Sequence, residues 1–175
     1  MTIAEFEQFL EAYERDVFTF CKHLVNGCHH TACDLYQDTA LAAFEMHGRI
    51  DREQNPKAFL FAIAAGKWKN MRRKARRRQN IAPEIPLQDW IAETGTGNPT
   101  AEAAEDALMQ AALYKAVAEL KDKFRIPLIL HYFDNCPVEN IAQICNIPTG
   151  TVKSRLHKAR ALLKKSMTKG GFSHE

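Results

Sequence analysis

The C-terminal quarter of the chain is rich in side chains that bind phosphate and donate hydrogen bonds. No Asp or Glu occurs from Asn140 to His174, whereas Lys, Arg, Ser, Thr and His are frequent there. Such side chains contact phosphate oxygens and the hydrogen-bonding edges of bases. A merely solvated helix would usually mix both signs of charge. The segment therefore predicts a surface for an anionic partner, although an ordinary solvated basic face is the simpler alternative.

A second cationic segment lies near the middle of the chain. Eight of the twelve residues from Lys67 to Arg78 are Lys or Arg. The formal charge is only +3 overall, but it alternates along the chain: −5 over 1–60, +8 over 61–80, −6 over 81–140 and +6 over 141–175. Two separate basic blocks indicate two surfaces that meet phosphate.

Metal or catalytic chemistry is less well supported by the sequence. The stretch C-H-H-T-A-C contains four potential ligands, Cys28, His29, His30 and Cys33, but its spacing matches no standard zinc motif and no second ligand pair follows. We predict no metal site and no cofactor, and leave open whether these side chains bind metal or sense redox state. The five cysteines lack a framework spacing and are expected to be reduced thiols. No phosphate-binding glycine loop or nucleophile motif is present, so an enzyme is not expected.

The C-terminal cations belong to a two-helix pattern over 137–165. Val138, Ile141, Ala142 and Cys145 share one helical face. The sequence Asn146-Ile147-Pro148 then stops that helix. A second helix follows, capped by Thr149 or Thr151, with an inward stripe of Val152, Leu156, Ala159, Leu162 and Leu163. This is the helix-turn-helix arrangement, whose second helix fits the major groove of DNA.

The elements that precede this motif are also predicted to be helices. Apolar residues at Phe6, Leu10, Tyr13, Val17, Phe20 and Leu24 predict a first helix that ends at Asn26-Gly27. A second helix is expected from Thr31, a possible cap, to His47, with Leu35, Ala42 and Met46 inward. A third should open at Asn55-Pro56 and become basic toward its end.

Residues 79–99 lose this periodicity and carry several Pro and Gly residues, which indicates an interdomain linker. Helix should resume at Thr100, with Leu108, Ala112, Val117 and Leu120 inward, and Arg125-Ile126-Pro127 should open another. No segment alternates with period two. We predict an all-α chain of two small helical domains joined by a flexible linker, with limits 1–80, 81–104 and 105–170. No secretory signal or membrane-length apolar stretch is found, so a cytoplasmic protein without membrane insertion is expected.

With both basic segments identified, the chain resembles the bacterial RNA polymerase sigma factors of the extracytoplasmic-function (ECF) type, which are group IV of the sigma-70 family. The segment I-P-T-G-T-V-K-S-R-L-H-K-A-R-A-L-L-K is similar to the signature of their C-terminal domain, region 4. The segment D-L-Y-Q-D-T is similar to the family's D-L-V-Q-E-T, and F-L-F-A-I-A-A-G-K-W-K-N-M-R-R-K is similar to a segment at the end of region 2. Ala65, Gly66 and Asn70 stand where Arg, Asn and Asp are usual.

The resemblance implies three sets of contact residues. Those for the minus-35 promoter element are Thr149, Thr151, Lys153, Ser154, Arg155, His157 and Lys158. Those for the minus-10 element are Arg49, Asn55, Lys67, Trp68, Lys69, Asn70, Arg72 and Arg73, and the loop from His47 to Asn55 would hold a base flipped out of the duplex. For Trp68, a place in the core is the alternative to stacking on DNA.

The third set would bind polymerase: Asp34, Leu35, Gln37, Asp38 and Phe44. The implied partners are core RNA polymerase, through its β′ clamp and β flap, promoter DNA and an anti-sigma factor. The function expected is promoter-specific initiation of transcription under stress or envelope-signal control. The alternative is a helix-turn-helix repressor or activator that does not bind polymerase, for which the sequence offers no obvious dimer face.

Overall fold

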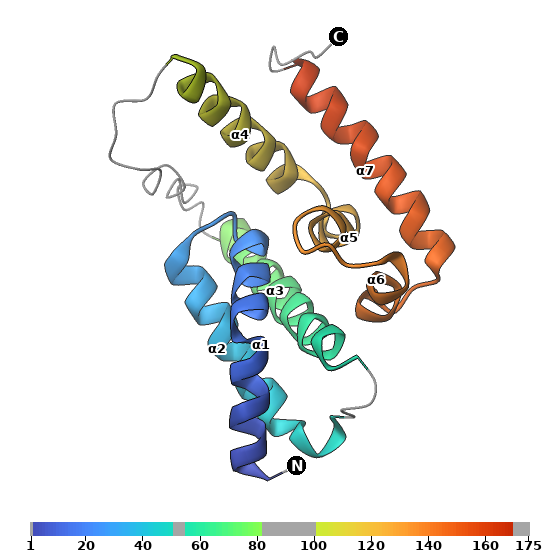
Figure 1. The fold of residues 1–175 in the computed structure, drawn as a ribbon. Coiled ribbons are helices and arrows are strands. Elements are labelled where there is room, and N and C mark those ends of the chain that lie inside the picture. Colours follow the sequence, from blue (N-terminus) through green and yellow to red (C-terminus); the bar gives the residue numbers. More distant parts are fainter. Residues whose placement is uncertain (1, 51–54, 82–100, 170–175) are drawn as a thin grey trace.

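The computed structural model describes residues 2–50, 55–81 and 101–169, and every regular element within these ranges is helical (Figure 1). The elements are α1 (Ile3–Leu24), α2 (His29–Glu45), a 3-10 turn η1 (His47–Arg49), α3 (Pro56–Ile81), α4 (Ala101–Glu119), α5 (Asp122–Tyr132), α6 (Val138–Cys145) and α7 (Thr149–Lys169). The predicted all-α class is confirmed. Most of the predicted linker, 81–104, lies outside the described residues, but α3 runs into its start and α4 begins before its end.

Helices α1, α2 and α3 form the N-terminal bundle. A capping box starts α1: the amide of Glu5 donates to the Thr2 hydroxyl (3.3 Å), and the Glu5 carboxylate accepts from the amide of Thr2 (2.7 Å). The helix ends where Asn26 and Gly27 adopt positive φ angles of 58° and 82°. The stacked rings of Phe20 and Phe61, 4.6 Å apart between centroids, join α1 to α3 in the core.

Helices α4 to α7 form the C-terminal half, in which α4 and α7 lie side by side (Figure 1). Helix α5 begins at Asp122, so the prediction that Arg125-Ile126-Pro127 opens this helix was wrong. Pro127 instead lies inside the helix, where it lacks an N–H to donate. All seven residues from 124 to 130 are buried, and this packing holds the helical course through the proline.

Other local predictions also need correction. Helix α2 begins at His29 and α7 at Thr149, so Thr31 and Thr151 lie inside helices and cap neither. Leu108 and Leu162 were predicted to face inward but are 64% and 38% exposed. Within the described residues, no other helix covers these two side chains as the core residues are covered. Within the described residues, no helix is both long and apolar enough to cross a membrane.

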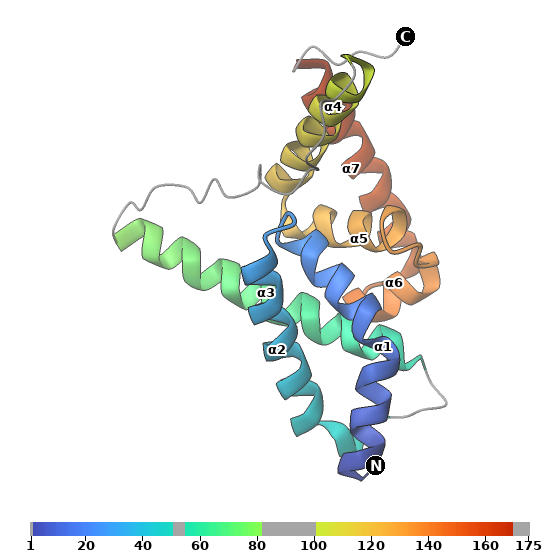
Figure 2. The ribbon, with the colours of Figure 1, turned by 60° about the vertical axis from the view of Figure 1, so that its left-hand side comes forward.

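The two halves pack against one another rather than standing apart. Helix α3 contacts α6, and α1 contacts α5 (Figures 1 and 2). Buried apolar side chains form one continuous cluster that extends from α1 to α7. The described chain therefore contains two helical bundles that share a core at their junction.

The five cysteines differ in burial, which predicts a labelling pattern. Burial raises the pKa of Cys21 to about 12 and that of Cys136 to about 11, whereas Cys28 and Cys33 are only half-buried. Because the thiolate is the nucleophile, we expect iodoacetamide at pH 8 to modify Cys28 and Cys33 at least about a hundredfold faster than Cys21 and Cys136. Peptide mass spectrometry over time would measure this. Protein unfolded in guanidinium should lose the difference, and equal rates in the folded protein would contradict the packing.

Candidate nucleic-acid interface

The helix-turn-helix is formed by α6, a tight turn and α7. Asn146 ends α6 in the left-handed conformation (φ 51°, ψ 55°), and the amide of Ile147 donates to the carbonyl oxygen of Ala142 (3.0 Å). Pro148 then precedes α7, whose residues Val152, Leu156 and Ala159 are buried against the other helices. The stop matches the prediction, and so do these three members of the predicted stripe, whereas Leu162 is exposed. The buried residues determine which face of α7 is free.

The residues predicted for the minus-35 element lie on that free face. Thr149, Lys153, Ser154, His157 and Lys158 are exposed, and Thr151 and Arg155 are half-buried. The Ser154 hydroxyl donates to the carbonyl oxygen of Thr151 (3.0 Å). One helix thus presents hydroxyl and cationic groups together at its N-terminal half, as a helix that enters the major groove must.

Helix α3 provides the second basic surface. Figure 2 shows its C-terminal part projecting past α1 and α2, and the residues from Arg73 to Arg78 are all exposed. Among the residues predicted for the minus-10 element, Lys69, Asn70 and Arg73 are exposed and Lys67 is half-buried. A guanidinium nitrogen of Arg73 donates to the side-chain oxygen of Asn70 (3.2 Å). The projecting cations lie in water and are available to a phosphate backbone.

Trp68 is placed differently from its predicted DNA contact. Its side chain is only 2% exposed, and the ring centroid lies 5.0 Å from the guanidinium carbon of Arg72 and 4.9 Å from that of Arg125. Trp68 therefore belongs to the hydrophobic core, which was the alternative to stacking on DNA. The reason is that α5 of the C-terminal half covers this side of α3.

Arg72 is also engaged by the other half of the chain. Its guanidinium forms an ion pair with the carboxylate of Asp122, the first residue of α5. Burial lowers the pKa of Arg72, and Asp122 opposes that change. The group stays charged, but its charge is already matched within the protein.

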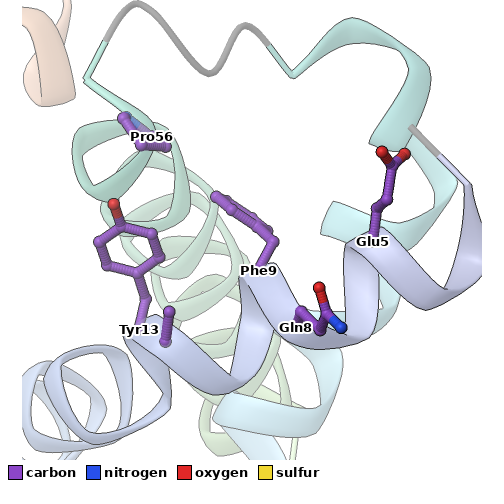
Figure 3. Close-up of a pocket in the computed structure, with 6 residues that line it drawn as sticks. Glu5, Gln8, Phe9, Tyr13 and Pro56 are labelled. Atoms are coloured by element: carbon purple, nitrogen blue, oxygen red, sulfur yellow. The ribbon is translucent and has the colours of Figure 1, made fainter.

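Two predicted minus-10 residues border the segment 51–54, which lies outside the described residues. The side chain of Arg49 lies outside them too, although its backbone belongs to η1. The side-chain oxygen of Asn55 accepts from the amide of Ala58 (3.0 Å) and thereby caps α3. Beside it, a hollow of about 240 Å³ is lined by α1 residues and Pro56 (Figure 3), with the rings of Phe9 and Tyr13 5.4 Å apart.

The residues predicted to bind polymerase lie on α2. Asp34, Gln37, Asp38 and Phe44 are exposed, Phe44 by 37%. Leu35 is 2% exposed and packs in the core, so it does not reach the surface and its predicted contact is corrected. Its backbone carbonyl accepts from the buried Thr39 hydroxyl (2.7 Å). Leu35 and Thr39 therefore hold α2 in place, and the exposed acidic and amide groups form its outer face.

The four potential metal ligands do not converge. Cys28 contacts the Thr31 hydroxyl (3.1 Å), His29 Nδ1 lies 3.5 Å from the Cys33 sulfur, and His30 pairs with Asp34 (3.3 Å). In the described part of the chain, no three His, Cys, Asp or Glu side chains gather as a metal site would require.

Arg125 is the residue that sequence reasoning missed. It is 3% exposed, and one of its guanidinium nitrogens donates to the carbonyl oxygen of Leu24 (2.5 Å) and to Oδ1 of Asn26 (2.6 Å). Burial lowers its pKa to about 10, so it stays charged at neutral pH. The sequence did contain a signal for this role: Arg125 lies within the apolar run F-R-I-P-L-I-L. A charged side chain in a buried segment is rarely left unpaired, so a polar partner for Arg125 could have been expected.

Two family models match the chain. Residues 9–78 match the model of sigma-70 region 2, and residues 110–163 match that of sigma-70 region 4. The two matches cover both basic helices and the predicted polymerase face of α2.

The chain is also similar to individual sigma factors. The chain is 24% identical to the ECF RNA polymerase sigma factor SigW of Bacillus subtilis, over 93% of this chain and 88% of that protein. It is 29% identical to the RNA polymerase sigma factor YlaC of the same organism, over 93% and 92% of the two chains. Among solved structures, it is similar to the sigma factor RpoE of Bartonella quintana in complex with the anti-sigma factor NepR (TM-score 0.72, 26% identity, 95% and 98% coverage). The fold is also similar to that in the complex of CnrH with the cytosolic domain of CnrY (TM-score 0.67, 16% identity, 96% and 90% coverage).

The positions of two arginines predict different effects on DNA binding. Arg155 lies among the hydroxyl and cationic groups of α7, whereas Arg77 lies on the projecting end of α3. We expect Arg155→Ala to weaken binding to a cognate site by about 1–3 kcal/mol with little change on unrelated DNA. Arg77→Ala should weaken binding on all sequences and reduce its salt dependence. Anisotropy titrations at several salt concentrations would separate the two, and equal losses on every sequence would refute the distinction.

Proposed function

Because the chain belongs to the sigma-70 family of bacterial RNA polymerase sigma factors, and to its extracytoplasmic-function type, we propose that its three exposed faces bind three different partners. The chain is a sigma factor that directs promoter-specific initiation of transcription and is not an enzyme. The outer face of α2 binds core polymerase at the β′ clamp, α3 contacts the minus-10 element, and α7 reads the minus-35 element. The observation that carries this assignment is the separation of these faces on different helices.

The chemistry of each face supports its assignment. Helix α7 offers hydroxyls and cations to base edges and phosphates. The exposed residues from Arg73 to Arg78 are cations apart from Ala75, which suits a DNA backbone held with less sequence selection. The aromatic rings of the hollow beside Pro56 are faces on which an extruded base can stack, next to the loop that we propose holds it.

A regulator that does not bind polymerase would leave the N-terminal bundle without a role. The match to region 2 covers that bundle, including the acidic face of α2 that a simple repressor does not need. We place the protein in the cytoplasm, with core polymerase and promoter DNA. An anti-sigma partner is further proposed, because the structural relatives were solved with the anti-sigma factor NepR and with the cytosolic domain of CnrY. Control by stress or an envelope signal would act through such a partner.

The first test is transcription with purified components. The chain should co-elute with core RNA polymerase on gel filtration and start transcripts from a promoter that core alone cannot use. A variant in which the basic face of α7 is neutralised should still co-elute and lose those starts. Failure of the parent chain to bind core at low salt would refute the assignment.

The acidic face of α2 predicts a more specific result. Asp38→Lys should weaken binding to core by about 1–2 kcal/mol, since it reverses an exposed charge in the proposed contact. Glu11→Lys on α1 makes the same charge change at an exposed position outside the predicted contact set and serves as the control. Competition with a labelled sigma factor for core would measure both affinities. An equal loss in the two variants would indicate a general charge effect and count against α2 as the docking face.

A further inference from the structure

Two lysine side chains of the C-terminal half share one aromatic ring. The ammonium nitrogen of Lys123, on α5, lies 5.0 Å from the ring centroid of Phe124, and that of Lys158, on α7, lies 6.0 Å from the same centroid. Helix α5 packs against α7, which brings the two ammonium groups together from distant parts of the sequence (Figure 1). Phe124 is only 8% exposed, whereas both lysines are exposed. The ring therefore holds two cations at the surface where α5 meets α7.

The charges of these two lysines are not balanced within the described part of the chain. Among the described residues, no carboxylate forms an ion pair with Lys123 or Lys158. Asp122 precedes Lys123 directly, but its carboxylate pairs with Arg72 of α3 instead. Two like charges beside one ring repel each other, and an anion close to both would relieve that repulsion. The pair is therefore suited to an anionic partner from outside the chain.

The lysine pair lies beside the residues of α7 that we assign to the minus-35 element. Lys158 follows Ser154 by one helical turn, and both side chains are exposed. The Lys158 ammonium group is directed toward Phe124 of α5, and so toward the flank of α7. When a helix lies in the major groove, base edges form the floor of the groove and phosphates line its two walls. Lys123 and Lys158 are thus placed for the phosphates of the wall on the α5 side.

The chemistry of lysine fits a backbone phosphate at this position. Its ammonium group is a compact charge with three donors, and it binds phosphate without the planar match that a guanidinium group requires. The contact with the Phe124 ring limits the positions of both ammonium groups before DNA binds, which reduces the entropy lost on binding. Contacts to phosphate fix the position and orientation of a protein on the duplex without reading its sequence.

We propose that Lys123 and Lys158, held by the Phe124 ring, form a phosphate clamp that contacts one backbone strand of the minus-35 duplex beside α7. The DNA interface then extends beyond the helix-turn-helix to α5, and Lys123 is a contact residue outside the predicted set. Within this clamp Lys158 binds the backbone and selects no base, in contrast to Arg155. The inference rests on the proposed role of α7 at the minus-35 element.

Loss of one phosphate contact has a characteristic effect on the salt dependence of DNA binding. The logarithm of the affinity falls with the logarithm of salt concentration, with a slope of about −0.9 for each phosphate neutralised. Lys123→Ala should therefore make this slope shallower by about 0.9 and weaken binding at low salt by about two- to fivefold, on cognate and unrelated duplexes alike. Lys123→Arg should preserve both values, because a guanidinium group also binds phosphate. Lys115→Ala removes the same charge from an exposed position on α4 and serves as the control.

The test uses DNA in which single phosphates are neutralised. A short fluorescein-labelled duplex with a minus-35 element is prepared as a series, and in each member a neutral methylphosphonate replaces one phosphate. Anisotropy titrations with the full chain at several salt concentrations give the affinity and the salt slope for each duplex. The clamp predicts a position on one strand where the substitution weakens binding of the parent chain and of Lys115→Ala, but weakens Lys123→Ala no further. Such a coupled loss reports a direct contact, because a structural role of Lys123 or a change in net charge would give additive losses.

Several results would overturn the clamp. Equal affinities and equal salt slopes for Lys123→Ala and Lys115→Ala would do so, as would additive losses at every methylphosphonate position. A parent chain that does not bind the duplex at low salt would also overturn it. If Lys123→Ala weakened binding to core polymerase and left DNA binding unchanged, the lysine pair would face an acidic protein surface instead of phosphate, and the clamp would again be overturned.

Transcription assays distinguish failure of this inference from failure of the proposed function. If the parent chain with core polymerase starts no transcripts, but Lys123→Ala still makes the salt slope shallower on an unrelated duplex, the proposed function is overturned and the lysine pair is supported as a DNA contact. If the parent chain supports transcription and Lys123→Ala behaves like Lys115→Ala in every DNA-binding assay, the clamp is overturned and the function stands.

Discussion

The junction between the two halves depends on the burial of one guanidinium group, that of Arg125. A buried cation is tolerated only where acceptors replace its lost water, and here they come from Leu24 and Asn26 at the end of α1, with the ring of Trp68 on α3. Removing one acceptor would leave the buried guanidinium group with fewer hydrogen-bond partners than it has N–H donors to satisfy. Separating the halves would not, because water would then hydrate Arg125 and both acceptors. The junction therefore combines the apolar cluster that the two halves share with a polar contact of specific geometry.

Features that depend on neighbouring residues in the sequence could be predicted, whereas features that depend on distant residues could not. The left-handed turn at Asn146 and the buried part of the α7 stripe, Val152, Leu156 and Ala159, depend on neighbouring residues and were predicted correctly. The start of α5 was not, because burial of 124–130 by other helices overrides the usual effect of Pro127. Leu108 and Leu162 fit a helical apolar pattern but are exposed, since periodicity gives the face of a helix and not the presence of a neighbour.

The same difference between local and distant partners applies to the residues of the candidate site. The free face of α7 could be predicted because its buried stripe determines the opposite, exposed one. On α3 the same reasoning fails at Trp68 and Arg72, which face a helix from the other half of the chain. Their partners, Asp122 and Arg125, lie about 50 residues away, and single-sequence patterns carry no information on such a pairing.

The two basic surfaces are consequently not equivalent in this structure. The outer face of α7 is exposed, whereas the middle of α3 contacts α6 and the side chains of Asp122 and Arg125 of α5, and its basic end projects. In the proposed function, the projecting cations of α3 attract DNA independently of its sequence, and α7 supplies the base contacts, while Trp68 stays buried.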